Sequence, residues 1–142
     1  MGAVDVPSSS LMHRWHRRGV FLTRRRITQR RFFHAVSSSA VDTVAPQLWA
    51  YEKRNCVLMA IRRGRISQPD GEQFLVSMNE LNVRLSEPAS YDEVFSLAQR
   101  HGLTVYDAAY LDVAIREQLP MATLDHQLVR AAQKAGVVLF QP

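Results

Sequence analysis

The chain has 142 residues, of which 46% are hydrophobic and 22% charged, which suits a single domain with a core that needs no covalent staples. A lone cysteine, Cys56, excludes an intrachain disulfide scaffold and fits a reducing compartment, so we expect a cytoplasmic protein. No stretch has the length and apolar character of a membrane-spanning helix, and we expect no membrane role.

The basic charge is concentrated near the N-terminus. Residues 1–40 carry eight arginines and one acid, Asp5, whereas residues 41–142 carry ten basic and twelve acidic side chains. Central strands of parallel sheets are usually continuous runs of Val, Ile and Leu. Residues 1–40 contain no such run, so a first strand is missing or corrupted there. We therefore divide the chain into an aberrant basic, Ser- and Arg-rich segment, residues 1–40, and a compact domain, residues 41–142.

Three interpretations of residues 1–40 stay open. If the DNA encoding residues 7–32 is read two nucleotides later, the allowed codons can give an apolar run followed by Leu-Asp-Ala-Ser, which is a strand that ends in an aspartate. The segment would then be an out-of-frame translation of a normal domain start. Alternatively, the arginines form a disordered arm whose contacts with RNA phosphates are sequence-independent and salt-sensitive. The Arg and Ser content with few acids also resembles a transit peptide.

From Val44 onward, the spacing of apolar residues predicts helices alternating with short strands. We expect helices over residues 44–64, 67–81, 91–102, 106–118 and 125–136, because each range combines helical periodicity with start or stop residues such as Pro46, Gly64 and Gly102. Short apolar stretches over residues 83–87, 103–105, 121–124 and 137–140 are typical of buried strands. Strands separated by helices predict an α/β fold with a parallel sheet covered on both faces.

Three acids are candidates for a shared site. Glu52 lies on one helical arc with Asn55 and with apolar neighbours, where a carboxylate is costly unless it is paired or bound to a cation. Asp107 and Asp125 each open a helix after a short apolar stretch, and ligands gather beyond the carboxyl ends of parallel strands. The alternative roles are a surface ion pair for Glu52 and helix capping for both aspartates. Together, three converging acids favour Mg²⁺ or Mn²⁺, which prefer oxygen ligands.

The segments VAPQLWAYEKRN, RRGRIS and LTVYDAAYLDVAIREQLPMATLDHQLVRAAQKAGV resemble the PIN-domain family, specifically the VapC-type toxin ribonucleases of type II toxin–antitoxin systems. The resemblance covers residues 44–140. It implies a three-layer α/β/α fold and Mg²⁺-dependent RNA cleavage, with Glu52, Asp107 and Asp125 as the second, third and fourth acids of the family's site. It also implies supporting roles for Thr123 and Asn55, a cognate antitoxin as partner, and a homodimer.

The chain departs from the family pattern at the first acid. Family members begin with an apolar strand that ends in Asp, and the sequence around Asp5 lacks that pattern. A catalytically inactive remnant that only binds an antitoxin or another subunit is therefore the alternative to an active ribonuclease. Three further cations, Arg62, Arg63 and Arg65, either favour the C-terminus of their helix or contact the RNA backbone.

The remaining features favour structural roles. The aromatic residues Trp49, Tyr51, Tyr106 and Tyr110 sit among apolar helical positions, so we expect core or dimer contacts rather than base stacking. Cys56 has no catalytic partner in the sequence, and we expect it to be buried as a small apolar residue.

Overall fold

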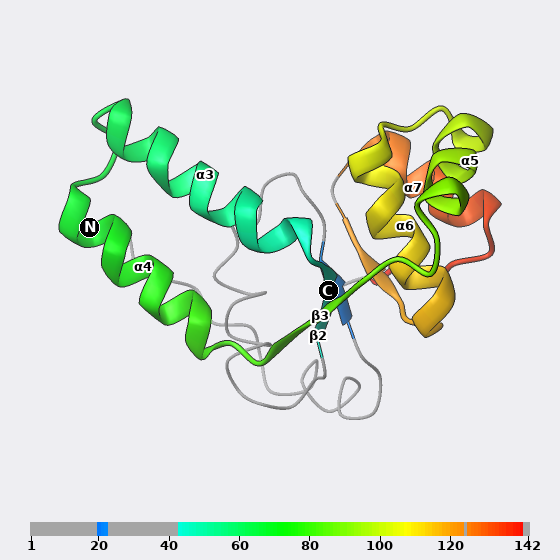
Figure 1. The fold of residues 1–142 in the computed structure, drawn as a ribbon, viewed down its shortest axis with the longest axis horizontal. Helices are drawn as coiled ribbons and strands as arrows, with labels where there is room; N and C mark the ends of the chain where they lie inside the picture. The colour runs from blue at the N-terminus through cyan, green and yellow to red at the C-terminus, as the bar shows by residue number, and fades with distance from the viewer. Residues whose placement is uncertain (1–19, 23–42, 124, 141–142) are drawn as a thin grey trace.

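The computed structural model describes residues 20–22, 43–123 and 125–140. Its strands are β1 (Val20–Leu22), β2 (Thr43–Pro46), β3 (Val83–Ser86) and β4 (Met121–Ala122). Its helices are α3 (Leu48–Arg62), α4 (Gln68–Glu80), α5 (Tyr91–His101), α6 (Val105–Glu117) and α7 (His126–Lys134) (Figure 1). None of these helices is both long and apolar enough to cross a membrane, within the residues described.

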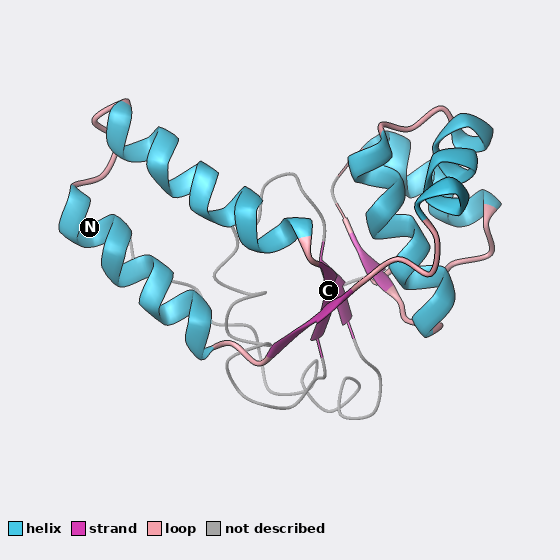
Figure 2. Cartoon of the chain, in the orientation of Figure 1, coloured by secondary structure: helices cyan, strands magenta, loops and turns pink. Residues whose placement is uncertain are grey.

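The four strands form one parallel sheet in the order β3-β2-β1-β4 (Figure 2). The three-residue strand β1 lies in the middle, where Val20 is in register with Thr43 and Phe21 with Met121. The structure therefore differs from the expectation of a missing first strand, because a short apolar run, VFL, supplies a central strand from within residues 1–40. The other residues of that segment lie outside the described ranges.

The predicted helix over residues 44–64 was wrong at its start. Residues Thr43–Pro46 form strand β2, all four residues are buried, and the strand pairs with β1 on one side and β3 on the other. Pro46 ends this strand, and α3 begins two residues later at Leu48. TVAP forms a strand because it is a short, mostly apolar segment, which suits a central strand buried on both faces of the sheet.

Two predicted strands are also absent from the described residues. In the range 103–105, Thr104 is the N-cap of α6, and its side chain accepts a hydrogen bond from the backbone N–H of Asp107. In the range 137–140, only Leu139 pairs, through a single parallel bridge to Met121. The strand over 83–87 and the helices α4, α5 and α7 agree with their predictions to within a few residues.

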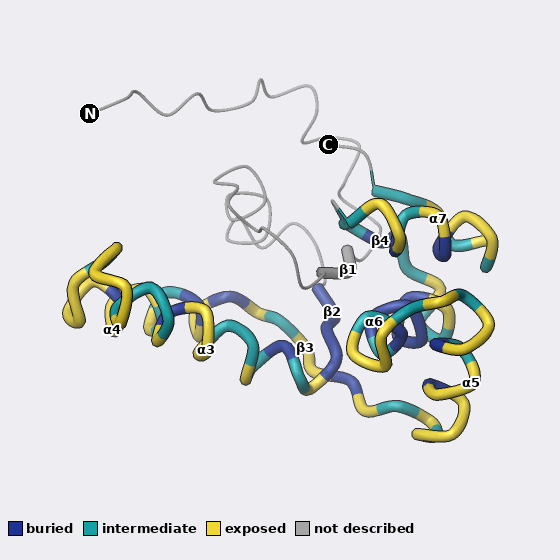
Figure 3. Tube along the Cα trace, turned by 90° about the horizontal axis from the view of Figure 1, so that it is seen from above, coloured by how far each residue is buried: buried dark blue, intermediate teal, exposed yellow. Residues whose placement is uncertain are grey.

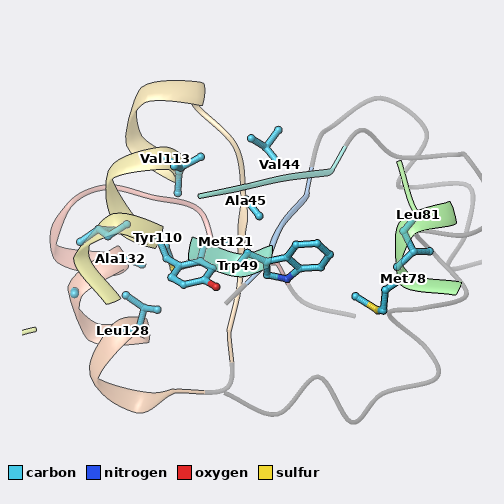
Figure 4. Close-up of a cluster of buried hydrophobic side chains, with 13 residues drawn as sticks. Val44, Ala45, Trp49, Met78, Leu81, Tyr110, Val113, Met121, Leu128 and Ala132 are labelled. Carbon is cyan, nitrogen blue, oxygen red and sulfur yellow. The ribbon is translucent and has the colours of Figure 1, made fainter. Parts of the chain in front are cut away.

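The sheet lies between two groups of helices. The hairpin of α3 and α4 lies on one side of the strands, and α5, α6 and α7 lie on the other, in both Figure 1 and the view from above in Figure 3. Core residues come from both layers, Trp49, Met78 and Leu81 from the first and Tyr110 and Leu128 from the second (Figure 4). The three-layer α/β/α fold with a parallel sheet is thereby confirmed.

Candidate active site

Glu52 is joined to α6 by a hydrogen bond between distant parts of the chain. It lies in the second turn of α3, just beyond the carboxyl end of β2, and its side chain is half-buried. The hydroxyl of Tyr110 donates a hydrogen bond to Oε2 of Glu52 at 2.5 Å, across 58 residues of sequence. Because Tyr110 is 0% exposed, this contact anchors the carboxylate to the core of the molecule.

Asp107 lies in the first turn of α6, one helical turn before Tyr110. Its backbone N–H donates to Oγ1 of Thr104 at 3.0 Å, and the Thr104 hydroxyl donates to Oδ2 of Asp107 at 2.7 Å. The first of these bonds gives a partner to a backbone N–H at the start of the helix, and the second orients the Asp107 carboxylate. Residues three apart on a helix share a face, so Asp107 is on the side of α6 from which Tyr110 reaches Glu52. The C-terminus of α6 leads into the start of β4, which puts its N-terminus toward the carboxyl ends of the strands.

Asp125 follows β4 and begins α7. Its Oδ1 accepts hydrogen bonds from the backbone N–H groups of Gln127, at 2.9 Å, and Leu128, at 3.1 Å. The backbone N–H of Asp125 donates in turn to Oγ1 of Thr123 at 3.0 Å. Thr123 therefore fixes the turn between β4 and α7, and the capping role that the sequence offered for Asp125 is present.

The other predicted site residues lie farther along α3. Asn55 is exposed, one turn beyond Glu52. Arg62, Arg63 and Arg65 are exposed at the far end of the helix, which at a rise of about 1.5 Å per residue is roughly 15 Å from Glu52. The arginines therefore lie at the opposite end of α3 from Glu52.

The donor chemistry fits a hard divalent cation, because the three acids offer only oxygen ligands. As the side chains stand, no three His, Cys, Asp or Glu residues within 20–22, 43–123 and 125–140 form a group that could hold a metal ion. Glu52 contacts α6 through Tyr110, and Asp125 caps α7. These contacts do not join the three acids into one cluster. Asp5, the one acid near the N-terminus, lies outside the described residues.

The structure adds two features at this site that the sequence did not single out. Tyr110 was predicted to be a core aromatic, which is confirmed, and its hydroxyl also contacts an acid of the candidate site. Lys53, next to Glu52, has Nζ 6.0 Å from the centre of the Trp49 ring. Desolvation lowers the pKa of Lys53, against smaller opposing effects of Cys56 and Glu52. The one signal for Tyr110 in the sequence was its spacing of three residues from Asp107.

Some of the expected burial was wrong. Cys56 is exposed rather than buried, because it lies on the outer face of α3. Among the aromatic residues, Trp49 and Tyr110 are buried, whereas Tyr51 and Tyr106 are exposed, at 79% and 57%, so for these two the expected dimer contact stays a prediction.

Comparisons with known proteins agree with the fold. No family model matches the chain. Ribonuclease VapC3 of Pyrobaculum aerophilum is 37% identical over 95 residues, which are 64% of this chain and 72% of that protein.

The crystal structure of PAE2754 from Pyrobaculum aerophilum superposes with a TM-score of 0.56 at 31% identity. The match covers 63% of this chain and 65% of the solved chain, so this protein spans slightly less than two thirds of that relative. With most of a VapC protein matched at this identity, and a parallel α/β/α fold shared with a solved relative, the chain belongs to the VapC family of PIN-domain proteins.

Proposed function

We propose that the chain is a Mg²⁺- or Mn²⁺-dependent endoribonuclease, the toxin of a type II toxin–antitoxin system, in which Glu52, Asp107 and Asp125 would hold the metal. The observation that carries the proposal is the hydrogen bond from Tyr110 to Glu52, which joins an acid of α3 to the helix whose first turn contains Asp107. A relative named as a ribonuclease, at 37% identity, supports the same reading.

The chain's own residues would orient the acids and bind the substrate. Thr104 holds one oxygen of Asp107, and Thr123 fixes the backbone at Asp125, so both aspartates have defined orientations. A bound metal would activate water and stabilise charge on the scissile phosphate. Arg62, Arg63 and Arg65, exposed at the end of α3, would contact RNA phosphates away from the cut.

The proposed partners and location follow from family membership. We propose a cognate antitoxin that restrains the activity, a homodimer, and residence in the cytoplasm. Asn55, exposed one turn from Glu52, would be a supporting polar group at the substrate side.

The test is an RNA cleavage assay with purified protein and labelled single-stranded RNA, in Mg²⁺ or Mn²⁺ and in EDTA. The matched control is Asp107→Asn, which keeps an oxygen for the Thr104 hydroxyl but removes the charge that a metal needs. We expect cleavage that requires the metal and that Asp107→Asn abolishes. Metal-independent cleavage, or equal cleavage by the variant, would contradict the proposal.

A second candidate is an inactive member of the family that binds an antitoxin or another subunit. It is favoured by the contacts of the two aspartates, since the Asp125 carboxylate caps α7 and the Asp107 carboxylate is bonded to the Thr104 hydroxyl without any metal. A folded wild-type sample that cleaves no RNA in either metal, yet binds a VapB-type antitoxin, would support this candidate.

A further inference from the structure

We propose that Tyr110 is a positioning residue for Glu52, whose carboxylate it holds on the side of α3 that faces α6 and so supports in divalent-metal binding. This inference rests on the proposed function, because it assigns a task to a neighbour of a proposed ligand. It goes beyond that function because Tyr110 itself need not touch the metal or the RNA.

Tyr110 is a core residue whose hydroxyl is hydrogen-bonded to Glu52. The side chain is fully buried, at 0% exposure, and belongs to the core cluster that also contains Trp49, Met121 and Leu128 (Figure 4). A buried hydroxyl needs a hydrogen-bond partner, and here the partner is a carboxylate oxygen on another helix. The packed ring fixes the position of the hydroxyl, so the hydroxyl in turn fixes the position of Oε2 of Glu52.

The contact of Tyr110 with Glu52 differs in range from the printed contacts of the other two acids. Asp107 is held by Thr104, and Asp125 by the first amides of α7, both within a few residues of sequence. The bond to Glu52 comes from another helix, across 58 residues of sequence. Tyr110 therefore ties the position of Glu52 to the packing of α6.

Donors that hold a metal-ligating carboxylate are costly to remove. Loss of such a group typically weakens metal binding or activity about 10- to 100-fold. A purely structural tyrosine would instead lower the melting temperature and leave the metal affinity of the folded protein unchanged.

The experiment compares wild type, Tyr110→Phe and the matched control Tyr51→Phe, which loses the hydroxyl of a residue that is 79% exposed on the same helix as Glu52. Mn²⁺ affinity is measured by electron paramagnetic resonance on samples whose folding is checked by circular dichroism. RNA cleavage gives kcat and KM separately. We expect Tyr110→Phe to bind Mn²⁺ about tenfold more weakly or worse and to lose kcat with little change in KM, whereas Tyr51→Phe behaves as wild type.

A second pair of variants isolates the route through Glu52. Glu52→Gln should weaken Mn²⁺ binding, and adding Tyr110→Phe to it should weaken binding no further. If Tyr110→Phe binds Mn²⁺ like wild type, or weakens binding equally in the Glu52→Gln background, the inference fails while the proposed function stands. A Tyr110→Phe chain without a cooperative melt would assign the residue to the core alone and also overturn the inference. A wild type that neither binds Mn²⁺ nor cleaves RNA would overturn the proposed function itself.

Discussion

At the scale of single residues, Asp125 combines two tasks that a substitution can separate. Its carboxylate caps α7 by accepting from the backbone N–H groups of Gln127 and Leu128, and it is also a proposed metal ligand. Asparagine caps helices about as well as aspartate does, whereas alanine does not. Asp125→Asn therefore removes the charge and keeps the cap, whereas Asp125→Ala removes both.

We predict that Asp125→Asn keeps the stability of wild type and loses the RNA cleavage. Asp125→Ala should lose both, with a cost of about 1 kcal/mol in the free energy of unfolding for the missing cap. Thermal melts followed by circular dichroism, together with the cleavage assay, measure the two effects. An Asp125→Asn protein that cleaves RNA like wild type would remove this carboxylate from the site.

At the scale of elements, a polar cluster ties the last turns of α6 to β3. Arg84 of β3 donates two hydrogen bonds to Glu117, at 3.2 and 2.7 Å, and Ser86 donates a third at 3.3 Å. The preceding residue, Arg116, donates hydrogen bonds to Asp112 at 2.8 Å and to the backbone oxygen of Glu87 at 2.7 Å. These contacts hold the helix that carries Asp107 at its other end, so they stabilise the layer on which the site is built.

Glu117 gives this cluster a pH dependence. The hydrogen bond and the charge of Arg84 lower the pKa of Glu117 below its usual value of 4.5, against a smaller effect of burial. A carboxyl group whose pKa is lowered on folding adds stability above its ordinary pKa and loses it as the pH falls through the lowered value.

We therefore predict that Glu117→Gln lowers the free energy of unfolding at pH 7 by about 0.2–1 kcal/mol, a small value because Arg84 is largely exposed. The difference in the free energy of unfolding between variant and wild type should shrink as the pH falls below about 4, because Glu117 of the wild type then becomes neutral like the glutamine of the variant. Urea unfolding at pH 7 and at low pH measures it. A difference that stays constant or grows with acidification would contradict the role of this pair.

The hairpin of α3 and α4 depends on a close approach at Gly71. A Cβ at this position would lie 2.7 Å from Cδ1 of Ile61 and 2.9 Å from Cγ1 of Val57, so the two helices touch where α4 has no side chain. Alanine favours a helix more than glycine does, by up to about 1 kcal/mol. The crowding against two side chains of α3 opposes that gain, at about 1–3 kcal/mol.

We predict that Gly71→Ala lowers the free energy of unfolding by about 1 kcal/mol. The second change Ile61→Val removes the nearer methyl group, so it should restore part of the loss in the Gly71→Ala background while destabilising the wild type. The melting temperatures of wild type, Gly71→Ala, Ile61→Val and the double variant measure how strongly the two positions are coupled. A Gly71→Ala protein that is more stable than wild type would show that the helices separate without cost.

At the scale of the whole molecule, local signals predicted the helices better than the strands. Ser67 and Asp125 each cap the helix that they were expected to begin, because capping needs only residues a few positions apart. Strand β2 was missed because the four residues TVAP precede a helix directly and Pro46 also suits a first helical turn. Its strand character depends on partners, β1 and β3, that the local sequence does not contain.

In the candidate site, too, the local features could be predicted and the long-range contact could not. The places of Asp107 and Asp125 at helix starts could be predicted, since each follows a short apolar stretch and is close to a threonine. The contact of Glu52 with Tyr110 could not be predicted, because it joins two helices 58 residues apart and depends on how both pack on the sheet. Whether the three acids close around a metal stays a prediction.

We also propose that residues 7–40 are an out-of-frame translation of a normal domain start, which would account for eight arginines beside a single acid in residues 1–40. We predict that the codons for residues 7–32, read two nucleotides later, encode an apolar strand that ends in aspartate. Reading the nucleotide sequence decides the matter. Codons that give no such strand in the shifted frame would leave the basic segment as a native part of the chain.

The central claim is that acids from α3, the start of α6 and the start of α7 bind one divalent ion. The most direct measurement is anomalous X-ray scattering from crystals of the protein soaked in Mn²⁺. We predict a manganese peak within bonding distance of carboxylate oxygens of Glu52, Asp107 and Asp125. Well-ordered crystals at saturating Mn²⁺ with no peak among these three residues, or with a peak elsewhere, would contradict the account.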